Sequence, residues 1–233
     1  SLTDDGRRLL PQVGVALEKL AEATDAFDTG PTDDLLTVAS SVSVAQWVIA
    51  PYLREFTDRY PTTRLRFLSA IWPDDFQSTR ADVEIRFGSE NQVGRNAELL
   101  TPARLVALKS PKLTGQLEDL PLIEAVGTSG GWKAWREQVG GGLNPQIFAD
   151  SYGLALHLAA QGNGVALVSE LLAGHAVRSD VLERVHTASI PSKEGYYLSI
   201  RKGTETASEF RTWLLDRLTR DAAFLVANAQ LPR

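Results

Sequence analysis

Residues 35–51, with the sequence LLTVASSVSVAQWVIAP, predict a buried strand that runs directly into the start of a helix. Ser40, Ser41 and Ser43 interrupt the short β-prone run where the chain must turn. The first N–H groups of a helix have no partner within the helix and carry the positive end of its dipole. The junction is therefore a suitable binding site for a polar or anionic small molecule. The alternative is that Ser43 only caps the helix and the other serines only form the turn.

The composition is that of an ordinary globular protein with one large or two small domains. Its 233 residues are 43% hydrophobic and 23% charged, with a net charge of −5. A negative charge without a long basic run argues against direct contact between these residues and nucleic acid. With no apolar stretch near the roughly 20 residues of a membrane span, and no secretory signal, we expect a cytoplasmic protein without a membrane partner. Because the chain has no cysteine, disulfides and thiolate metal sites are excluded.

The first thirty residues predict a long helix that pairs with a second chain. Thr3 and the acidic residues after it can cap its start, and Thr29-Gly30-Pro31 ends it. At roughly 35–40 Å, this helix is too long to be covered by the domain that follows it. The alternative is a helix that folds back on its own domain. The apolar residues of its heptad seam, spaced by three and four, are Leu9, Val13, Ala16, Leu20, Ala23 and Phe27.

The rest of the chain predicts two α/β units with the same order of strands and helices. That order implies right-handed strand–helix–strand crossovers. The expected strands are residues 35–39, 63–70, 82–87, 103–108, 122–124, 145–149, 165–169 and 196–201. One helix is expected to start at Ser43, and Pro51 either kinks it or begins a second helical piece. The other expected helical segments are residues 74–79, 130–138, 152–161 and 207–218.

Several short motifs follow one another in a fixed order. They are LTDDG at 2–6, W-x3-P-x4-F-x3-YP at 47–61, ADVEIRFG at 81–88, WKAW at 132–135, FADS at 148–151, AAQGNGVALVS at 159–169 and F-x2-WL at 210–214. In this order and spacing they resemble the LysR-type transcriptional regulators over nearly the whole chain. The IRFG and W-x2-W elements are most similar to the branch that includes the glycine-cleavage activator and the β-lactamase regulator.

The resemblance implies an α/β fold of two Rossmann-like subdomains around a central cleft, as in type 2 periplasmic binding proteins. A long linker and dimerisation helix, residues 1–30, would precede subdomain I, residues 33–109 plus 204–233, and subdomain II, residues 110–203. It also implies a winged helix-turn-helix before this chain, because Leu2-Thr3-x2-Gly6 matches the end of that domain's wing. The missing domain would contact DNA, and the chain would form a homodimer or homotetramer.

The resemblance further implies an effector site in the cleft for a polar or anionic small molecule, with no catalytic group, metal or cofactor. Ser41 and Ser151 are expected to face each other across the cleft. The implied lining residues are Ser40, Ser41, Val42, Ser43, Ile71, Trp72, Arg86, Phe87, Thr128, Ser129, Asp150, Ser151, and Tyr196 or Tyr197.

Some of these residues have a purely structural alternative. Arg86 either pairs with a ligand carboxylate or with Glu84 or Asp82. For Asp150 we favour a helix N-cap over a ligand contact. For Trp72, packing at the edge of a subdomain is the alternative to a place in the pocket. For Trp132 and Trp135, packing in the core is the expected role.

Two other classes of protein fit parts of the sequence. A solute-binding protein of a transporter has the same two-lobed cleft, but it needs an export signal and no dimerising helix. An enzyme would need a nucleophile with a base or a phosphate-binding loop, and the G-x-G at 162–164 follows a helix rather than a strand. The histidines show no metal-ligand spacing. We therefore predict a non-enzymatic regulator in which an effector changes the geometry of the dimer or tetramer and hence DNA binding.

Overall fold

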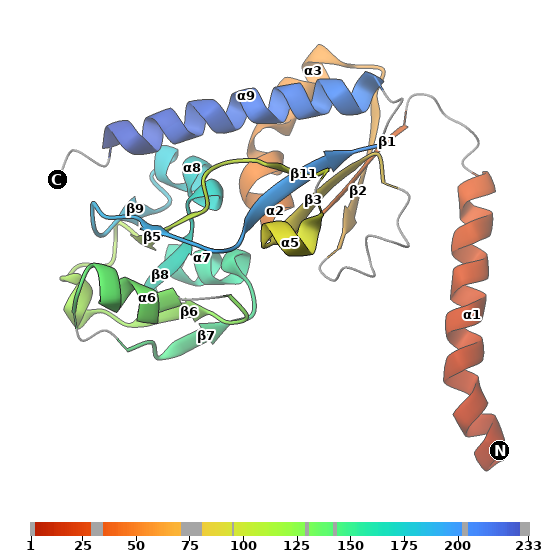
Figure 1. Cartoon of the computed structure of the whole chain (residues 1–233), viewed down its shortest axis with the longest axis horizontal. Helices are drawn as coiled ribbons and strands as arrows, with labels where there is room; N and C mark the ends of the chain where they lie inside the picture. Colours follow the sequence, from red (N-terminus) through yellow and green to blue (C-terminus); the bar gives the residue numbers. More distant parts are fainter. Residues whose placement is uncertain are drawn as a thin grey trace. The chain divides into compact units, whose positions relative to one another are not determined.

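The computed structural model describes residues 3–28, 35–70, 81–94, 96–128, 131–141, 144–201 and 205–228. The chain divides into two units, Ser1–Leu35 and Leu36–Arg233. The first contains helix α1, Asp4–Asp28, which confirms the predicted long helix and begins where the Gly6 N–H donates to the Thr3 hydroxyl (3.2 Å) (Figure 1). Of its apolar residues, the exposed ones include Leu9, Leu10, Val13, Val15 and Leu17. The side chains of Leu20, Ala23 and Phe27 lie outside the described part of the structure.

The second unit contains two sheets. The first has the strand order β2-β1-β3-β11-β4, in which β1 and β3 are parallel and β3 and β11 are antiparallel. The parallel pair requires the crossover that the sequence predicts. The strands are β1 Leu35–Ser40, β2 Arg64–Ser69, β3 Val83–Gly88, β4 Glu98–Leu99 and β11 Gly195–Ile200. We call this sheet and its helices lobe I.

The second sheet has the order β10-β5-β8-β6-β7, and β9 pairs with β5. Here β6 is parallel to both β7 and β8, whereas β5 and β8 are antiparallel. Strand β8 is buried along its whole length, as its continuous apolar sequence predicts. The strands are β5 Arg104–Lys109, β6 Leu122–Ala125, β7 Ile147–Ala149, β8 Val165–Ser169, β9 Glu183–Arg184 and β10 Ile190–Pro191. This sheet and its helices form lobe II.

The chain passes between the lobes twice, at residues 100–103 and at residues 192–194. Strand β5 pairs in the second sheet and β11 in the first. The predicted boundaries at 109 and 203 place these two strands in the opposite lobes. The sequence does not show this because both strands are apolar enough for either sheet, and only long-range pairing assigns them.

A helical stretch of changing geometry follows β1. It consists of α2 Val42–Val44, the π-helical η1 Ala45–Ile49, the 3₁₀ turn η2 Ala50–Tyr52 and α3 Leu53–Arg59. Pro51 has no N–H to donate to the preceding turn, so the regular hydrogen-bond ladder cannot pass through it. The prediction that Pro51 interrupts this helix is confirmed.

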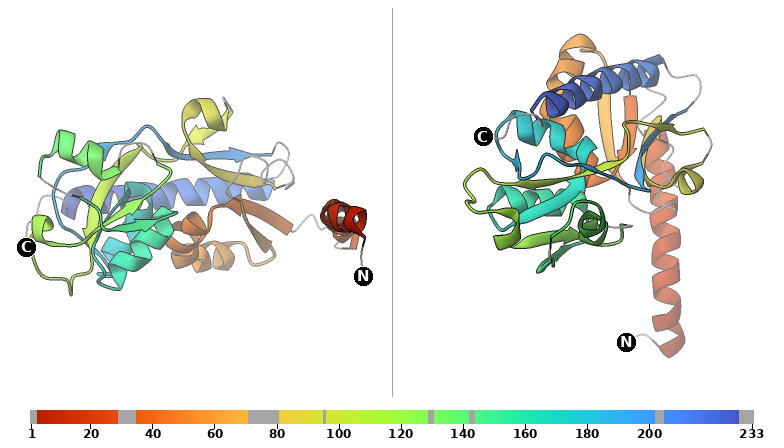
Figure 2. Two further views of the ribbon diagram at one scale, coloured as in Figure 1. Left: turned by 90° about the horizontal axis from the view of Figure 1, so that it is seen from below. Right: turned by 60° about the vertical axis from the view of Figure 1, so that its left-hand side comes forward.

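The other helices cover the sheets (Figures 1 and 2). They are α5 Glu90–Val93, η3 Leu117–Asp119, α6 Gly131–Gln138, α7 Tyr152–Ala160, α8 Glu170–Arg178 and α9 Glu205–Asn228. The sequence interpretation missed α8 and made α9 too short. The helical turn expected at residues 74–79 lies outside the described residues. No helix in the described part of the chain is both long and apolar enough to cross a membrane.

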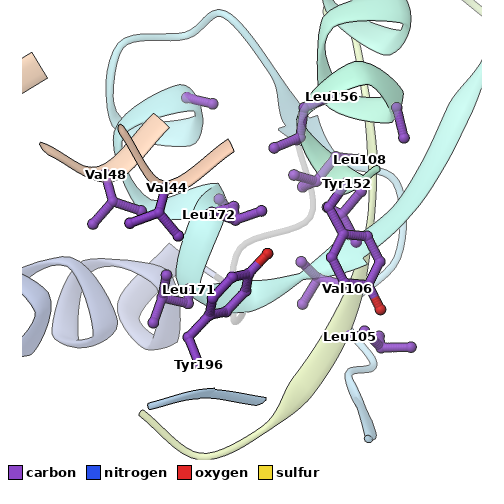
Figure 3. Packing of buried hydrophobic residues seen from close by; sticks show 14 of the residues in the cluster. Val44, Val48, Leu105, Val106, Leu108, Tyr152, Leu156, Leu171, Leu172 and Tyr196 are labelled. Carbon is purple, nitrogen blue, oxygen red and sulfur yellow. The ribbon is translucent and has the colours of Figure 1, made fainter. Parts of the chain in front are cut away.

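The apolar core of the second unit runs through both lobes. Figure 3 shows Val44 and Val48 of lobe I beside Leu171 and Leu172 of lobe II, with Tyr196 nearby, and all belong to one cluster of buried residues. The predicted packing role of Trp132 and Trp135 is confirmed because both are completely buried.

Candidate functional site

The serines after β1 have three different roles. Ser41 is the N-cap of α2, because its backbone is extended and its hydroxyl accepts a hydrogen bond from the Val44 N–H (3.3 Å). Ser40 is buried, and its hydroxyl donates to the carbonyl of Ser41 (3.3 Å). The alternative prediction that Ser43 is the cap is wrong, since Ser43 already lies inside the first helical turn.

Ser43 instead connects the two lobes. Its hydroxyl accepts a buried hydrogen bond from the N–H of Gly153, the second residue of α7 (3.0 Å). A Cβ atom at Gly153 would lie only 2.5 Å from this hydroxyl oxygen, so a side chain there would push the helices apart. The starts of α2 and α7 therefore meet at this point.

The start of α7 is capped by Ser151, whose hydroxyl accepts from the Leu154 N–H (3.3 Å). The prediction that Asp150 is the N-cap is wrong by one residue, and Asp150 is exposed. Ser41 and Ser151 thus play the same part in the two lobes. At the starts of α2 and α7, three backbone N–H groups make no hydrogen bond in the described part of the structure. They belong to Val42, Ser43 and Tyr152.

Three aromatic side chains pack together beside these helix starts. Phe87, at the end of β3, meets Tyr152 of α7 edge-on (5.7 Å between ring centroids, 88°) and Tyr196 of β11 at a tilt (5.0 Å, 51°). Tyr152 and Tyr196 are each 4% exposed, whereas Phe87 is 36% exposed. This aromatic cluster joins residues of both lobes and leaves the ring of Phe87 accessible; Figure 3 shows its two buried tyrosines, Tyr152 and Tyr196.

Both tyrosines of the aromatic cluster are neutral at physiological pH. Burial raises the pKa of Tyr152 to about 12, opposed by an interaction with the Thr128 hydroxyl and aided by the negative charges of Glu194 and Glu124. Burial also raises the pKa of Tyr196, with a smaller contribution from Tyr152. Their hydroxyl groups therefore keep their protons and can donate hydrogen bonds.

Two predicted site residues lie on the opposite face of the first sheet. Side chains alternate along a strand, and the pairing of β3 with β11 places Arg86 and Tyr197 on one face and Phe87 and Tyr196 on the other. Arg86 forms an ion pair with Glu84, the alternative that the sequence left open (Nη2 to Oε2, 2.5 Å). Tyr197 lines a separate surface hollow of about 250 Å³, together with Glu90, Gly94, Ala97 and Leu99.

Of the other predicted residues, Phe87 and Tyr196 are in contact with each other, and Ser43 contacts the start of α7, which Ser151 caps. Ile71, Trp72 and Ser129 lie outside the described residues. The sequence interpretation missed Tyr152 and Gly153. A glycine directly inside the first turn of a predicted helix indicates that another group comes close, and that pattern could have identified Gly153.

The site provides N–H donors at the starts of two helices, hydroxyl groups and an aromatic surface. These groups suit the binding of a small molecule. In the described part of the chain, no group of three or more His, Asp or Glu side chains is placed to hold a metal ion.

Comparisons with known proteins identify the family of this chain. The sequence matches the family model of the LysR substrate binding domain over residues 29–219. It is 25% identical to a glycine cleavage system transcriptional activator homolog of Haemophilus influenzae, covering 94% of this chain and 77% of the relative. It is 27% identical to the transcriptional activator AmpR of Pseudomonas aeruginosa, covering 95% and 78%.

Solved structures show the same fold. The effector domain of AmpR from Pseudomonas aeruginosa superimposes with a TM-score of 0.64 at 24% identity, covering 82% of this chain and 98% of that domain. The relatives are transcriptional regulators, which does not favour the alternative of a transporter's solute-binding protein. The two-lobed body has the type 2 periplasmic-binding-protein-like fold, and the chain belongs to the LysR-type transcriptional regulators, of which it forms the effector-binding region.

Proposed function

We propose that a small polar or anionic effector binds between the lobes at the starts of α2 and α7. The hydrogen bond between Ser43 and Gly153 is the observation that carries this proposal, because it brings together the positive ends of helices from different lobes. The amides of Val42 and Tyr152 make no hydrogen bond among the described residues and are available to an acceptor on the effector.

The proposed site is smaller than the predicted one and includes one new residue. Arg86 is left out because it is paired with Glu84, and Tyr197 because it lies on the other face of its sheet. Tyr152 is added from the aromatic cluster. The residues kept are Ser40, Ser41, Val42, Ser43, Ile71, Trp72, Phe87, Thr128, Ser129, Asp150, Ser151 and Tyr196.

The output of the sensor is proposed to be a change in oligomer geometry. Helix α1 exposes Leu9 and Val13 of its heptad seam, which a second copy of the chain would cover in a homodimer or homotetramer. A winged helix-turn-helix N-terminal to α1 would then contact DNA. An effector that binds one arrangement of the oligomer more tightly than another shifts the population toward it.

A thermal-shift screen of polar and anionic metabolites tests the proposal. An effector at 100 times its dissociation constant stabilises the folded protein by about 2.7 kcal/mol. Ser41→Trp should abolish the shift caused by the best ligand, because an indole at this position fills the space in front of both helix starts. Ser41→Gly should retain most of it, because glycine also tolerates the N-cap position and leaves the space open.

Thr212→Trp controls for the addition of a large side chain, because Thr212 lies on the exposed face of α9. It should bind the ligand like the wild type. A shift that persists in Ser41→Trp would place the site elsewhere and refute the proposal.

A further inference from the structure

Helix α8 belongs to lobe II but packs against lobe I. It lies between β8 and β9, both in the second sheet, and contacts η1 and α9. Gly174 permits this close packing, because a Cβ atom there would lie 2.6 Å from the Cβ of Asp221 on α9. The two helices therefore approach each other directly over a carboxylate group.

Asp221 is 7% exposed and accepts hydrogen bonds from three elements. Its Oδ1 atom accepts hydrogen bonds from the guanidinium groups of Arg178 in α8 (2.5 Å) and Arg217 in α9 (3.0 Å) and from the hydroxyl of Tyr52 in η2 (3.3 Å). Asp221 thus pairs with two guanidinium groups, one from each lobe, and Arg217 also pairs with the more exposed Glu55 (3.5 Å). Loss of Asp221 would leave the buried guanidinium of Arg217 with the more exposed Glu55 as its remaining ion-pair partner, which is unfavourable in a buried position.

Aromatic rings cover the ion cluster around Asp221. The guanidinium of Arg217 stacks 4.0 Å over the ring of Tyr52, and that of Arg178 lies 4.6 Å from the ring of Phe224. His175 of α8 meets Tyr52 edge-on at 5.3 Å. The side chains of Asp221 and Arg217 are each 9% exposed, so the attraction between them is stronger than that of a surface ion pair, whereas Arg178 is 33% exposed.

The first half of α9 is fixed to lobe I. Phe210 and Trp213 pack against Phe56 of α3, with ring centroids 5.3 and 5.4 Å apart. The second half carries Asp221 and reaches α8. With 24 residues, α9 is long enough to contact both lobes, and Figure 1 shows it passing from one to the other.

We propose that α9, anchored through Asp221, clamps the two lobes in one fixed arrangement. Three contacts hold them: Ser43 with Gly153, Tyr52 with His175, and Asp221 with Arg178. The first two lie along one helical stretch, about 13 Å apart at 1.5 Å per residue. The third comes from a different helix but lies beside the second, because Asp221 also accepts a hydrogen bond from Tyr52 (3.3 Å). The lobes are therefore held at both ends of this helical stretch, and these two attachments together oppose their separation.

The consequence for sensing rests on the proposed function: an effector would act on a cleft of fixed width, and the response would arise between subunits instead of from closure of the lobes. The clamp itself does not depend on that proposal. It can be tested without any effector.

Pulsed electron spin resonance on the whole chain measures the arrangement of the lobes. The chain has no cysteine, so Asp58→Cys on α3 and Lys133→Cys on α6 introduce one exposed spin label in each lobe. Dilution with excess unlabelled protein removes distances between subunits. The wild type should give one narrow distance distribution.

Arg178→Gln removes the lobe II partner of Asp221 but leaves the pair between Asp221 and Arg217. It should broaden the distance distribution or add a second one, and it should lower amide-exchange protection in α8 and the second half of α9 at least tenfold. Arg220→Gln is the matched control, because Arg220 loses the same charge on the exposed side of α9, where its side chain pairs with Asp216. It should behave like the wild type.

Two separate distances in the wild type, or equal behaviour of Arg178→Gln and Arg220→Gln, would overturn the clamp. If circular dichroism shows that Arg178→Gln does not fold, Arg178→Lys replaces it. Lysine keeps the charge but lacks the planar guanidinium that lies 4.6 Å from the ring of Phe224, so a smaller change in the same direction is expected.

Discussion

Tyr152 places a hydroxyl group where the two lobes meet, beside Phe87, whose ring also packs against the buried Tyr196. Its importance could not be predicted from the sequence, because its neighbours come from β3 and β11, far away along the chain. The same holds for the three serines after β1. All are suitable caps by residue type, and the backbone torsion angles alone make Ser41 the cap and leave Ser43 to bond Gly153.

The raised pKa of Tyr152 gives a prediction about alkaline stability. Between pH 10 and pH 12 the unfolded chain releases the phenol proton while the folded chain keeps it, so stability falls as the pH rises through this range. Tyr152→Phe has no such proton. Its free energy of unfolding in urea should therefore decrease less than that of the wild type from pH 9 to pH 12, by up to about 2–3 kcal/mol.

Tyr60→Phe is the control, because Tyr60 is partly exposed and packs against Phe56 in lobe I. An alkaline loss of stability in Tyr152→Phe as large as that of the wild type would show that burial does not suppress this ionisation.

At the scale of elements, the spacing of hydrophobic residues and the positions of turn residues are sufficient to predict most of the helices and strands. The predicted strands, the interruption at Pro51 and the long N-terminal helix all appear in the structure. Helix α8 was missed because it follows β8 without an intervening loop, and only Ser169 and Glu170 separate the apolar residues of the strand from those of the helix. The lobe to which β5 and β11 belong depends on pairing over long distances, which local sequence does not encode.

The seam of α1 provides a prediction for this element. Val13 lies on the seam, whereas Val15 lies about 200° around the helix from it, and both are exposed. Val13→Glu should weaken self-association at least tenfold, because the seam would bury a charge, and light scattering after size exclusion should show more monomer. Val15→Glu makes the same chemical change on the side of α1 away from the seam, and this variant should self-associate like the wild type. Equal association of both variants would mean that α1 does not form the subunit contact.

At the scale of the whole molecule, the sequence predicted two α/β units, and the structure joins them into one body. Residues 36–233 form one unit whose buried cluster includes Ile85 of lobe I and Ile123 of lobe II. A shared core of this kind makes the lobes depend on each other for stability. The sequence could not show this, because a cluster of residues from both sheets exists only once the crossing strands and α8 are in place.

A cavity in one lobe should therefore destabilise both. Ile123→Ala removes a fully buried side chain of β6 and should lower the free energy of unfolding by about 2–5 kcal/mol. If the lobes unfold together, hydrogen exchange of the most protected amides must accelerate by the same factor in β3 of lobe I and β8 of lobe II. Val126→Ala, at an exposed position of lobe II, should leave both strands unchanged. Faster exchange confined to β8, with β3 as protected as in the wild type, would show that the lobes unfold separately despite their common core.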